Sequence, residues 1–315
     1  MSFNNFIIQP VAGRIGAEII GIDLNQALSD DIIALIRQAL IRYRVVFFRG
    51  QTLDERGHVL FARCFGQLTI AHPTVPAFSP TYPEIFDLDY GQQFAYTDHW
   101  HTDVTFVERP PLGSILRALV IPTFGGDTVW ANTVAAYDDL PSYLKALAEQ
   151  LWVVHTNGSD YAASTVDVSS STREYAQVFQ STVYETIHPA VQVHPESGER
   201  SLLLGGFAQR IKGLSTADSF HTLQLLQSYV TRLENTVRWR WQVGDVAFWD
   251  NRSTQHYAIA DYGDRPRRVQ RVTIAGGIPV NIHGQKGEVI RGDSGFYSPS
   301  LTPNHSTENS LSHRR

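Results

Sequence analysis

Two kinds of hydrophobic spacing alternate along the chain, and together they predict short strands with a few helices. Four segments repeat apolar residues every three or four positions, the period of a helix that buries one face. They begin at residues suited to a helix N-terminus: Ser29, Thr52 with Glu55, Pro141, and Ser215 with Asp218. Eight further segments are short, rich in β-branched and aromatic residues and bounded by turn formers, which is typical of strands. These are residues 44–48, 113–120, 128–130, 190–194, 201–204, 236–242, 245–249 and 269–275.

Many short strands with helices between only some of them favour a mainly β fold with peripheral helices. The architecture we expect is a double-stranded β-helix, or jelly roll, because a doubly wound sheet would alternate strands and helices regularly. No linker rich in Pro, Gly or Ser divides the first 290 residues, so we expect a single domain over residues 1–292. The polar, weakly patterned residues 293–315 are expected to form a flexible tail.

Composition limits the classes of function. The chain has 26 Lys and Arg against 31 Asp and Glu, a net charge of −5, which disfavours non-specific binding to nucleic acid or anionic membranes. No apolar stretch approaches the roughly 18 residues of a spanning helix, and the first residues lack a signal-peptide pattern. One cysteine, Cys64, excludes an internal disulfide. We therefore expect a cytoplasmic protein whose metal chemistry, if any, uses histidines and carboxylates.

The densest chemical signal is the segment WHTDVTF. On a strand, residues i and i+2 face the same side, so His101 and Asp103 would present an imidazole and a carboxylate to one point. His99 lies roughly 13 Å from Asp103 along an extended strand and is too far away to share one ion. Two ligands of a metal site are therefore predicted, although a His-x-Asp pair also occurs by chance in many proteins.

The best third ligand is His256, in the segment WDNRSTQHY that follows the expected strand 245–249. Two histidines and one carboxylate on one face of an ion leave the other positions open, as in non-heme Fe(II) oxygenases. Three protein ligands with an open position also suit catalytic zinc, which leaves a zinc hydrolase possible. A histidine beside aromatic residues is otherwise usually a hydrogen-bonded core or rim residue.

Arginines recur on a strand near the C-terminus. Strand alternation places Arg267, Val269, Arg271 and Thr273 on one face of the segment RPRRVQRVTI. If that face points into the roll, two guanidinium groups enter the cavity, and a buried arginine requires an anion such as a carboxylate or sulfate. The alternative is a solvated basic edge strand.

Taken together, these motifs resemble the taurine dioxygenase family of Fe(II)- and 2-oxoglutarate-dependent oxygenases. The resemblance covers nearly the whole chain up to about Gly292. It runs from GRIGAE and VVFFR through WHTDVTF, GGDT and WDNRSTQH to the arginine strand. Within the family, the segments WANT, HTN and HPESGER are most similar to the alkylsulfate dioxygenase branch.

The resemblance implies a role for each matching residue. It assigns iron to His101, Asp103 and His256. It assigns 2-oxoglutarate to Thr128 and Arg267, with Arg271 meeting the anionic end of the substrate and also approaching the cosubstrate, and it assigns substrate contacts to His72 and Val104. Taurine-specific members carry a tyrosine and an asparagine where this chain has Val75 and Thr97, which implies a more apolar pocket.

The implied activity is that of a dioxygenase using Fe(II), 2-oxoglutarate and O₂ to hydroxylate a C–H bond next to the anionic group of a small organic substrate. An alkyl sulfate would be cleaved to an aldehyde and sulfate. Sulfonates and aryloxyalkanoates are alternative substrates, and a non-catalytic small-molecule-binding jelly roll is an alternative from another class. Family members commonly assemble, so a homo-oligomer, dimer or tetramer, is expected, with neither nucleic acid nor a membrane as partner.

Overall fold

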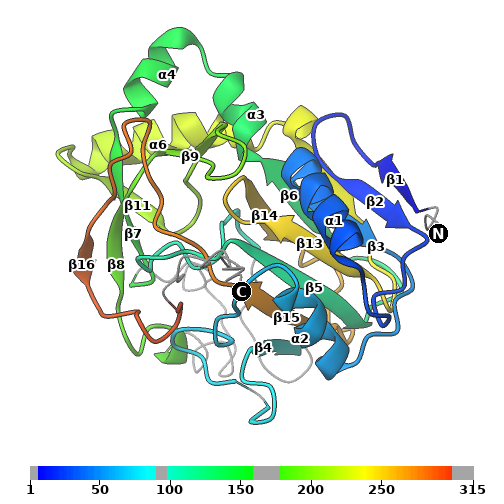
Figure 1. The fold of residues 1–315 in the computed structure, drawn as a ribbon. Helices are drawn as coiled ribbons and strands as arrows, with labels where there is room; N and C mark the ends of the chain where they lie inside the picture. The colour runs from blue at the N-terminus through cyan, green and yellow to red at the C-terminus, as the bar shows by residue number, and fades with distance from the viewer. Residues whose placement is uncertain (1–5, 78, 90–97, 159–176, 300–315) are drawn as a thin grey trace, which may run out of the picture.

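The computed structural model describes residues 6–77, 79–89, 98–158 and 177–299. Its largest sheet has the strand order β1-β2-β3-β13-β5-β15-β4 (Figure 1). Neighbours in it are antiparallel, except for the parallel pair β2 and β3. The strands are β1 (Ile7–Pro10), β2 (Ala17–Ile20), β3 (Val45–Phe48), β4 (Ile85–Asp89), β5 (Gly113–Val120), β13 (Val246–Asp250) and β15 (Arg268–Ile274).

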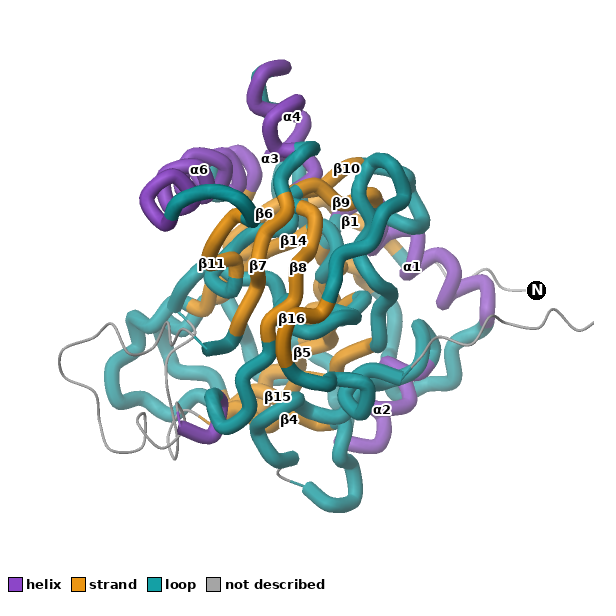
Figure 2. Tube along the Cα trace, turned by 90° about the vertical axis from the view of Figure 1, so that its left-hand side faces the viewer, coloured by secondary structure: helices purple, strands orange, loops and turns teal. Residues whose placement is uncertain are grey.

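Smaller antiparallel sheets complete the β structure, with the orders β12-β6-β14, β11-β7-β8-β16 and β10-β9. In Figure 2, β7, β8 and β16 run side by side. These sheets contain β6 (Thr128–Asn132), β7 (Trp152–Thr156), β8 (Glu185–Pro189), β9 (Val191–Val193), β10 (Arg200–Leu202), β11 (Ala208–Ile211), β12 (Thr236–Trp239), β14 (Thr254–Ala258) and β16 (Val289–Arg291). The mainly β architecture is confirmed, and it is that of a jelly roll.

The central strands of the large sheet are buried on both faces. Because successive side chains of a strand point to opposite sides, β3 and β13 contribute to two different cores. One side packs under the helices α1 and α2 and contains Val46, Phe48, Val246 and Phe248. The other side faces β6 and β12 and contains Val45, Phe47, Ala247 and Trp249. This two-sided burial explains why these segments are continuous apolar runs in the sequence.

The helices lie outside the sheets. Helices α1 (Asp30–Tyr43) and α2 (Glu55–Arg63) cover one face of the large sheet, and α3 (Thr133–Asp138), α4 (Ser142–Ala148) and α6 (Thr216–Val230) lie together at the top of Figure 1. A short 3₁₀ turn, η2, spans Leu233–Asn235. Four of these helices were predicted, and the short α3 was not.

The predicted helix caps are correct in two cases and wrong in one. Ser29 and Ser215 cap α1 and α6 as predicted, each accepting a backbone N–H of the first turn. For α2 the cap is Asp54, whose carboxylate accepts from the Gly57 N–H at 2.6 Å, and not Thr52. The Thr52 hydroxyl instead accepts from Asn25 Nδ2 at 2.6 Å. A carboxylate is the better acceptor at the positive end of a helix, so Asp54 displaces Thr52 from this position.

All eight predicted strands are present. Strand β5 has the predicted bounds, and the other seven begin or end at different residues. The strands β1, β2, β4, β7, β8, β11, β14 and β16 were not predicted. Two of them, β1 and β16, are largely exposed and therefore lack a clear apolar pattern. The place of β16 also depends on pairing with the distant strand β8, which the local sequence does not encode.

The first part of the expected C-terminal tail is ordered against the body of the protein. Residues 293–299 belong to the described ranges, and the Tyr297 side chain is fully buried. The Tyr297 N–H donates to the Ser294 carbonyl at 3.0 Å, which closes a turn. Residues 293–299 therefore contact the body of the protein, and residues 300–315 lie outside the described residues. The flexible tail stays a prediction.

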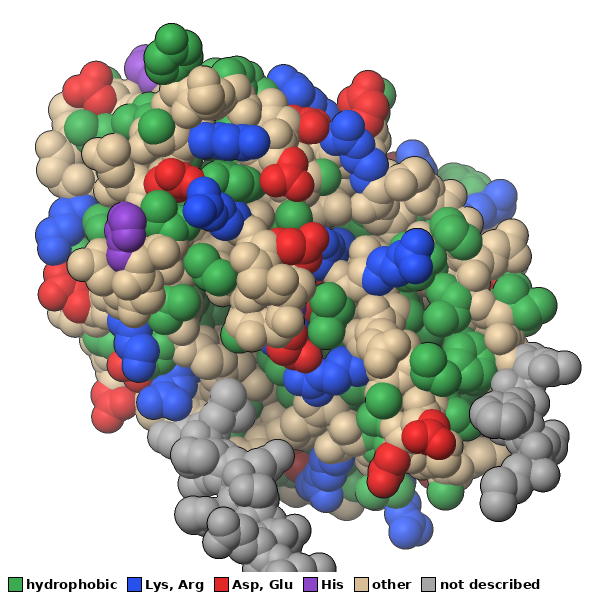
Figure 3. Space-filling view, turned by 45° about the horizontal axis from the view of Figure 1, so that its top comes forward, with side chains coloured by type: hydrophobic (Ala, Val, Ile, Leu, Met, Phe, Trp, Pro, Cys, Tyr) green, Lys and Arg blue, Asp and Glu red, His purple; other side chains and the backbone are tan. Residues whose placement is uncertain are grey.

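Surface properties agree with the modest net charge. Acidic and basic side chains are interspersed on the face shown in Figure 3. Among the helices in the described part of the chain, none has the length and apolar character needed to cross a membrane.

A buried ion-pair network fixes the turn between β13 and β14. The Asp250 carboxylate accepts from Arg252 Nε at 2.9 Å and Nη2 at 2.7 Å, and His194 Nε2 donates to it at 2.9 Å. Burial alone raises the pKa of Asp250, but Arg252 and His194 outweigh this effect and hold the pKa below its usual value. The carboxylate therefore stays ionised and holds the turn that connects the two sheets.

Replacing Asp250 by alanine should lower the free energy of unfolding by about 2 kcal/mol or more at pH 7. Arg252 would keep Glu196 at 2.7 Å but would lose its two bonds to the buried carboxylate, and His194 would lose its acceptor. The pKa of Asp250 is lower in the folded than in the unfolded chain, so its contribution is fully present above about pH 4 and is lost as the pH falls. Urea unfolding at pH 7 and pH 3 measures both effects. The exposed control Asp264→Asn should change the unfolding free energy by less than about 0.5 kcal/mol, and an equally stable Asp250→Ala variant would refute the network's role.

Candidate metal centre

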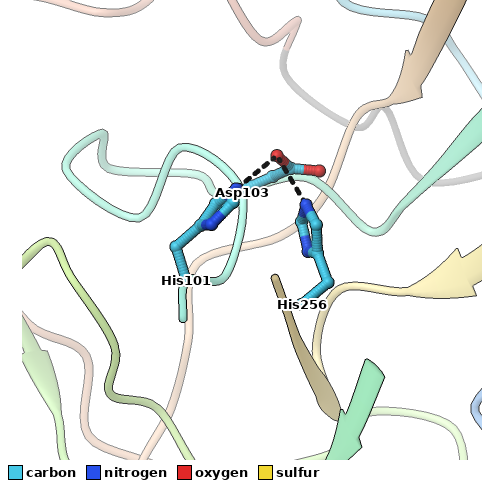
Figure 4. Close-up of side chains that lie close together, drawn as sticks. All are labelled: His101, Asp103 and His256. Carbon is cyan, nitrogen blue, oxygen red and sulfur yellow. Dashed lines mark ion pairs between the residues drawn. The ribbon is translucent and has the colours of Figure 1, made fainter. Parts of the chain in front are cut away.

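The three predicted ligands lie together inside the roll. Asp103 Oδ1 is 3.9 Å from His101 Nε2 and 3.8 Å from His256 Nε2, and all three side chains are buried (Figure 4). Their candidate ligand atoms lie within 4.8 Å of one another. Within the described ranges, this is the one set of His, Cys, Asp and Glu side chains close enough to share an ion. His99 is not part of it; its ring stacks on His101 with 4.9 Å between centroids.

Backbone pairing brings the two histidines together. The His101 N–H donates to the His256 carbonyl at 3.0 Å, and the His256 N–H donates to the His101 carbonyl at 2.8 Å. His101 Nδ1 lies 2.9 Å from the carbonyl oxygen of His99, which can only accept, so this nitrogen carries the proton. The Nε2 lone pair of His101 therefore points toward Asp103 and is available to a metal ion.

Asp103 does not lie on a strand, which corrects the sequence-based geometry. His101 forms a single isolated bridge with His256, and Asp103 follows in a turn where Val104 has a positive φ of 52°. The Asn251 side chain holds this turn because it accepts from the Asp103 N–H at 2.9 Å and donates to the Asp103 carbonyl at 3.0 Å. The backbone turns at Asp103, where an extended strand was predicted, yet the side chains of His101 and Asp103 still lie close together.

Charge at the centre is balanced by Arg271. One of its nitrogens contacts Asp103 Oδ1, and Ser114 Oγ donates to Asp103 Oδ2 at 2.8 Å. Burial raises the pKa of the Asp103 carboxyl, but its neighbours, above all the charge of Arg271, outweigh burial and hold the pKa at about 2. Burial lowers the pKa of both histidines, so their imidazoles are neutral. An ionised carboxylate with two neutral imidazoles is a donor set that fits Fe(II).

A cavity next to these residues is bounded by the two facing sheets. The polar side chains around it are His101, His256, Thr128, Arg267 and Arg271. The rest of the lining is apolar: Phe86, Leu88, Leu116, Trp130, Trp249, Ala258 and Val269. Arg267 is 3 % exposed, and its Nε donates to the Gly126 carbonyl at 3.1 Å. The inward face predicted for Arg267, Val269 and Arg271 is confirmed, and a solvated edge strand is excluded for them.

The Thr128 hydroxyl has a defined direction of hydrogen bonding. Trp241 Nε1 lies 3.0 Å from Thr128 Oγ1, and both side chains are buried. An indole N–H can only donate, so the Thr128 oxygen accepts here and its own proton is left for another acceptor. Trp241 thereby prepares Thr128 to donate into the cavity.

His72 is a buried, neutral hydrogen-bond donor. Its Nδ1 accepts from the backbone N–H groups of Thr74 and Val75, both at 3.2 Å, so the proton is on Nε2. Burial, and to a smaller extent the charge of Arg271, lowers the pKa of His72 to about 3. Its ring packs on Phe86 and Phe179, with centroid distances of 5.5 and 5.1 Å.

An aromatic cluster adjoins His72 and the turn after Asp103. It consists of Val104, Phe106, Val107, Phe179, Tyr184, Phe207 and Tyr297, with Val75 packed against it. The surroundings of Val75 are therefore apolar, as predicted. Thr97, the other position taken to indicate an apolar pocket, lies outside the described residues.

Sequence reasoning missed the residues that hold this site in shape. Ser114, Asn251 and Trp241 contact the predicted ligands or Thr128, but none belongs to a spacing pattern with known chemistry. Asn251 belongs to the WDNRSTQH segment. Its position directly after a buried strand was the one feature of the sequence that could have indicated its role at the site.

Comparisons with known proteins agree with this geometry. Residues 7–273 match the model of the family described as taurine catabolism dioxygenase TauD, TfdA family. The chain is 55 % identical over 286 residues to an alpha-ketoglutarate-dependent sulfate ester dioxygenase of Pseudomonas putida, covering 90 % of this chain and 94 % of that one. It is 52 % identical over 283 residues to an alkylsulfatase of Acinetobacter baylyi, covering 89 % and 88 %.

A solved structure gives the same result for the fold. A taurine dioxygenase from Burkholderia xenovorans superposes with a TM-score of 0.78 at 38 % identity, over 91 % of this chain and 95 % of that one. The family model matches most of the chain, two relatives are more than 50 % identical to it, and the fold is shared. This protein therefore belongs to the TauD/TfdA family of dioxygenases.

Proposed function

We propose that this dioxygenase uses Fe(II), 2-oxoglutarate and O₂ to cleave alkyl sulfate esters to an aldehyde and sulfate. The observation that carries the proposal is Arg271, a buried cation that lines the cavity and contacts the candidate ligand Asp103, while an apolar aromatic cluster begins at the next residue, Val104. Such a place suits a substrate with an anionic head and a hydrocarbon tail. The names of the relatives from Pseudomonas putida and Acinetobacter baylyi support the same substrate class.

In this proposal His101, Asp103 and His256 hold Fe(II) on one face. The donor set fits, because it combines two neutral imidazoles with one ionised carboxylate at mutual distances of 4.8 Å or less. Ser114 and Asn251 keep Asp103 in place. Fe(II) with 2-oxoglutarate and O₂ supplies the oxidation of a C–H bond to C–OH, while 2-oxoglutarate is converted to succinate and CO₂.

Arg267 and Thr128 are the proposed contacts for the distal carboxylate of 2-oxoglutarate. Both line the cavity beside the ligands and both are buried. A guanidinium matches a carboxylate in charge and shape, and the Thr128 hydroxyl adds one donor whose direction Trp241 determines. Arg271 approaches the same cavity and is the proposed shared contact of cosubstrate and substrate.

The substrate head group is proposed to bind Arg271 and His72. The neutral Nε2–H of His72 donates to an anion without adding charge, and the backbone turn at Val104 adjoins the same region. Val75, Val104 and Phe106 give the tail an apolar environment. Positioning by these residues decides which carbon is oxidised.

Hydroxylation of the carbon that bears the sulfate oxygen gives a hemiacetal-type sulfate, RCH(OH)OSO₃⁻. The C–O bond to sulfate then breaks, the hydroxyl loses its proton, and aldehyde and sulfate leave. A sulfonate or an aryloxyalkanoate presents a similar anion and is the alternative substrate. Family membership favours this redox reaction over a zinc hydrolase or a non-catalytic jelly roll.

We also propose that the enzyme is cytoplasmic and homo-oligomeric. An exposed free thiol at Cys64 is compatible with a reducing compartment. Sedimentation of the purified protein would determine whether it is a dimer or a tetramer.

Replacing Asp103 by alanine should abolish Fe(II) binding and Fe(II)-dependent succinate formation. The loss should exceed the roughly 10- to 100-fold cost of losing an outer-shell partner, because the single anionic ligand is removed. His256→Ala should behave alike. Bound iron and succinate are both measured, with the exposed His221→Ala as the control that keeps both. Wild-type iron content in Asp103→Ala would remove this residue from the site.

Replacing Arg267 by alanine should raise the KM for 2-oxoglutarate by about a hundredfold and leave the KM for the alkyl sulfate nearly unchanged. The exposed Arg265→Ala is the matched control and should alter neither constant. Trp241→Phe should raise the KM for 2-oxoglutarate by about fivefold, since one hydrogen bond is lost. In a Thr128→Val protein, the additional Trp241→Phe substitution should not raise the KM for 2-oxoglutarate further. Equal losses for both substrates would contradict the assignment.

Catalytic efficiency should rise with the chain length of a linear alkyl sulfate. Each buried methylene should contribute about 0.8 kcal/mol, roughly a fourfold factor, until the pocket is filled. Arg271→Ala should flatten this series, because the tail loses the anchor of its head group. A homologous series of alkyl sulfates is assayed beside taurine and one aryloxypropionate. Preference for taurine would contradict the apolar pocket, and preference for the aryloxypropionate would replace the sulfate as the anion.

A further inference from the structure

The chain beyond the family match returns to the substrate side of the site. Strand β16 pairs with β8, at the left of Figure 1, which fixes the backbone up to Arg291. Gly292 then adopts a positive φ of 82° and passes so close to Tyr184 that a Cβ here would lie 2.6 Å from the Tyr184 ring. The turn from Ser294 to Tyr297 follows directly. This C-terminal segment, residues 292–298, is thus held by pairing and packing.

Tyr297 extends from this segment into the aromatic cluster. Its side chain is 0 % exposed and packs in one cluster with Phe106 and Val104, the residue that follows the candidate ligand Asp103. The match to the family model ends at residue 273, so nothing in that match assigns a role to Tyr297.

The polar atoms near Tyr297 suggest that an anion belongs here. Tyr297 Oη, Arg271 Nε and Thr273 Oγ1 are each buried and form no hydrogen bond within 3.5 Å. Thr273 and Arg271 lie on the same face of β15, and the Thr69 backbone N–H donates to the Thr273 carbonyl at 3.0 Å. Buried polar atoms without partners are rare, so each of these three atoms calls for a partner that satisfies it.

The charges of the site affect the Tyr297 phenol. Burial raises its pKa, Arg271 lowers it and Asp103 raises it, so the hydroxyl is protonated and feels both charged groups. The Thr69 hydroxyl also lowers this pKa. Thr69 Oγ1 donates its own proton to the Ile70 carbonyl at 2.8 Å. A sulfate oxygen carries charge and is a strong acceptor for a phenol O–H.

We propose that Tyr297 is a further substrate-binding residue, whose hydroxyl donates to the sulfate head group beside Arg271 while its ring borders the hydrocarbon tail. This inference rests on the proposed function and adds to it a determinant of specificity from the C-terminal segment. A donor on the side of the sulfate away from the cosubstrate would fix the orientation of the head group, and with it the carbon that is oxidised.

The test measures, by calorimetry, the binding of octyl sulfate to the full-length Tyr297→Phe protein. The protein is loaded with Fe(II) and 2-oxoglutarate, and oxygen is excluded so that no turnover occurs. The ring is kept, so packing is preserved. Loss of one hydrogen bond to a charged group should weaken octyl sulfate binding about tenfold or more. The affinity for 2-oxoglutarate should stay within twofold of the wild type, because this cosubstrate contacts other residues.

Tyr184→Phe is the matched control. Tyr184 is a buried phenol of the same cluster; burial and the charge of Asp293 raise its pKa, whereas Arg271 and Asp103 both act on Tyr297. This variant should bind octyl sulfate like the wild type. A second variant, Tyr297→Leu, removes the ring as well and should move the preferred alkyl chain to a greater length.

The outcomes separate the two levels of the proposal. Wild-type protein that binds no alkyl sulfate overturns the proposed function and this assignment with it. Octyl sulfate binding that is intact in the wild type and unchanged in Tyr297→Phe overturns the assignment of Tyr297 alone. The assignment is also overturned if Tyr297→Phe weakens 2-oxoglutarate binding as much as octyl sulfate binding. It is likewise overturned if Tyr184→Phe weakens octyl sulfate binding as much as Tyr297→Phe does. Either result shows that Tyr297 acts through packing.

Discussion

A carboxylate and a guanidinium meet in the interior of the roll, and the chemistry of the site depends on how these two charges are balanced. Asp103 and Arg271 are both more than 90 % buried, where an unpaired ion costs several kcal/mol. Each is at present the counter-charge of the other. A divalent cation bound to Asp103 would take over that role and would leave Arg271 in need of an anion. In the proposed function, metal binding and anion binding would therefore be linked through this one pair of residues.

This pair exists because of simple strand alternation in the large sheet. Strand β15 places Val272 and Ile274 in the core beneath the helices and Val269, Arg271 and Thr273 on the opposite face. Burial of the apolar side holds the register, since a shift by one residue would exchange the two faces. The same packing that stabilises the sheet thus fixes the direction of Arg271.

The sequence was sufficient for features that depend on residue type and short periods. These include the jelly-roll class, the caps Ser29 and Ser215, the inward arginine face and the three residues His101, Asp103 and His256. It was insufficient where a distant contact decides. Val104 is β-branched and gives no local sign of a positive φ, so the turn at Asp103 was read as a strand. Likewise, the last residues are mostly polar and have few apolar positions. Their pattern does not indicate that Tyr297 packs into an aromatic cluster, because long-range contacts assemble that cluster.

The central claim, that sulfate is released by oxidation of the neighbouring carbon, is tested most directly with isotopic oxygen. Octyl sulfate is incubated with the Fe(II)-loaded protein and 2-oxoglutarate under ¹⁸O₂, and succinate, octanal and sulfate are quantified by mass spectrometry. The account predicts equal amounts of the three products, one ¹⁸O atom in succinate and none in sulfate, because the ester oxygen leaves with sulfur. Release of sulfate without succinate, together with octanol, would show hydrolysis and contradict the account.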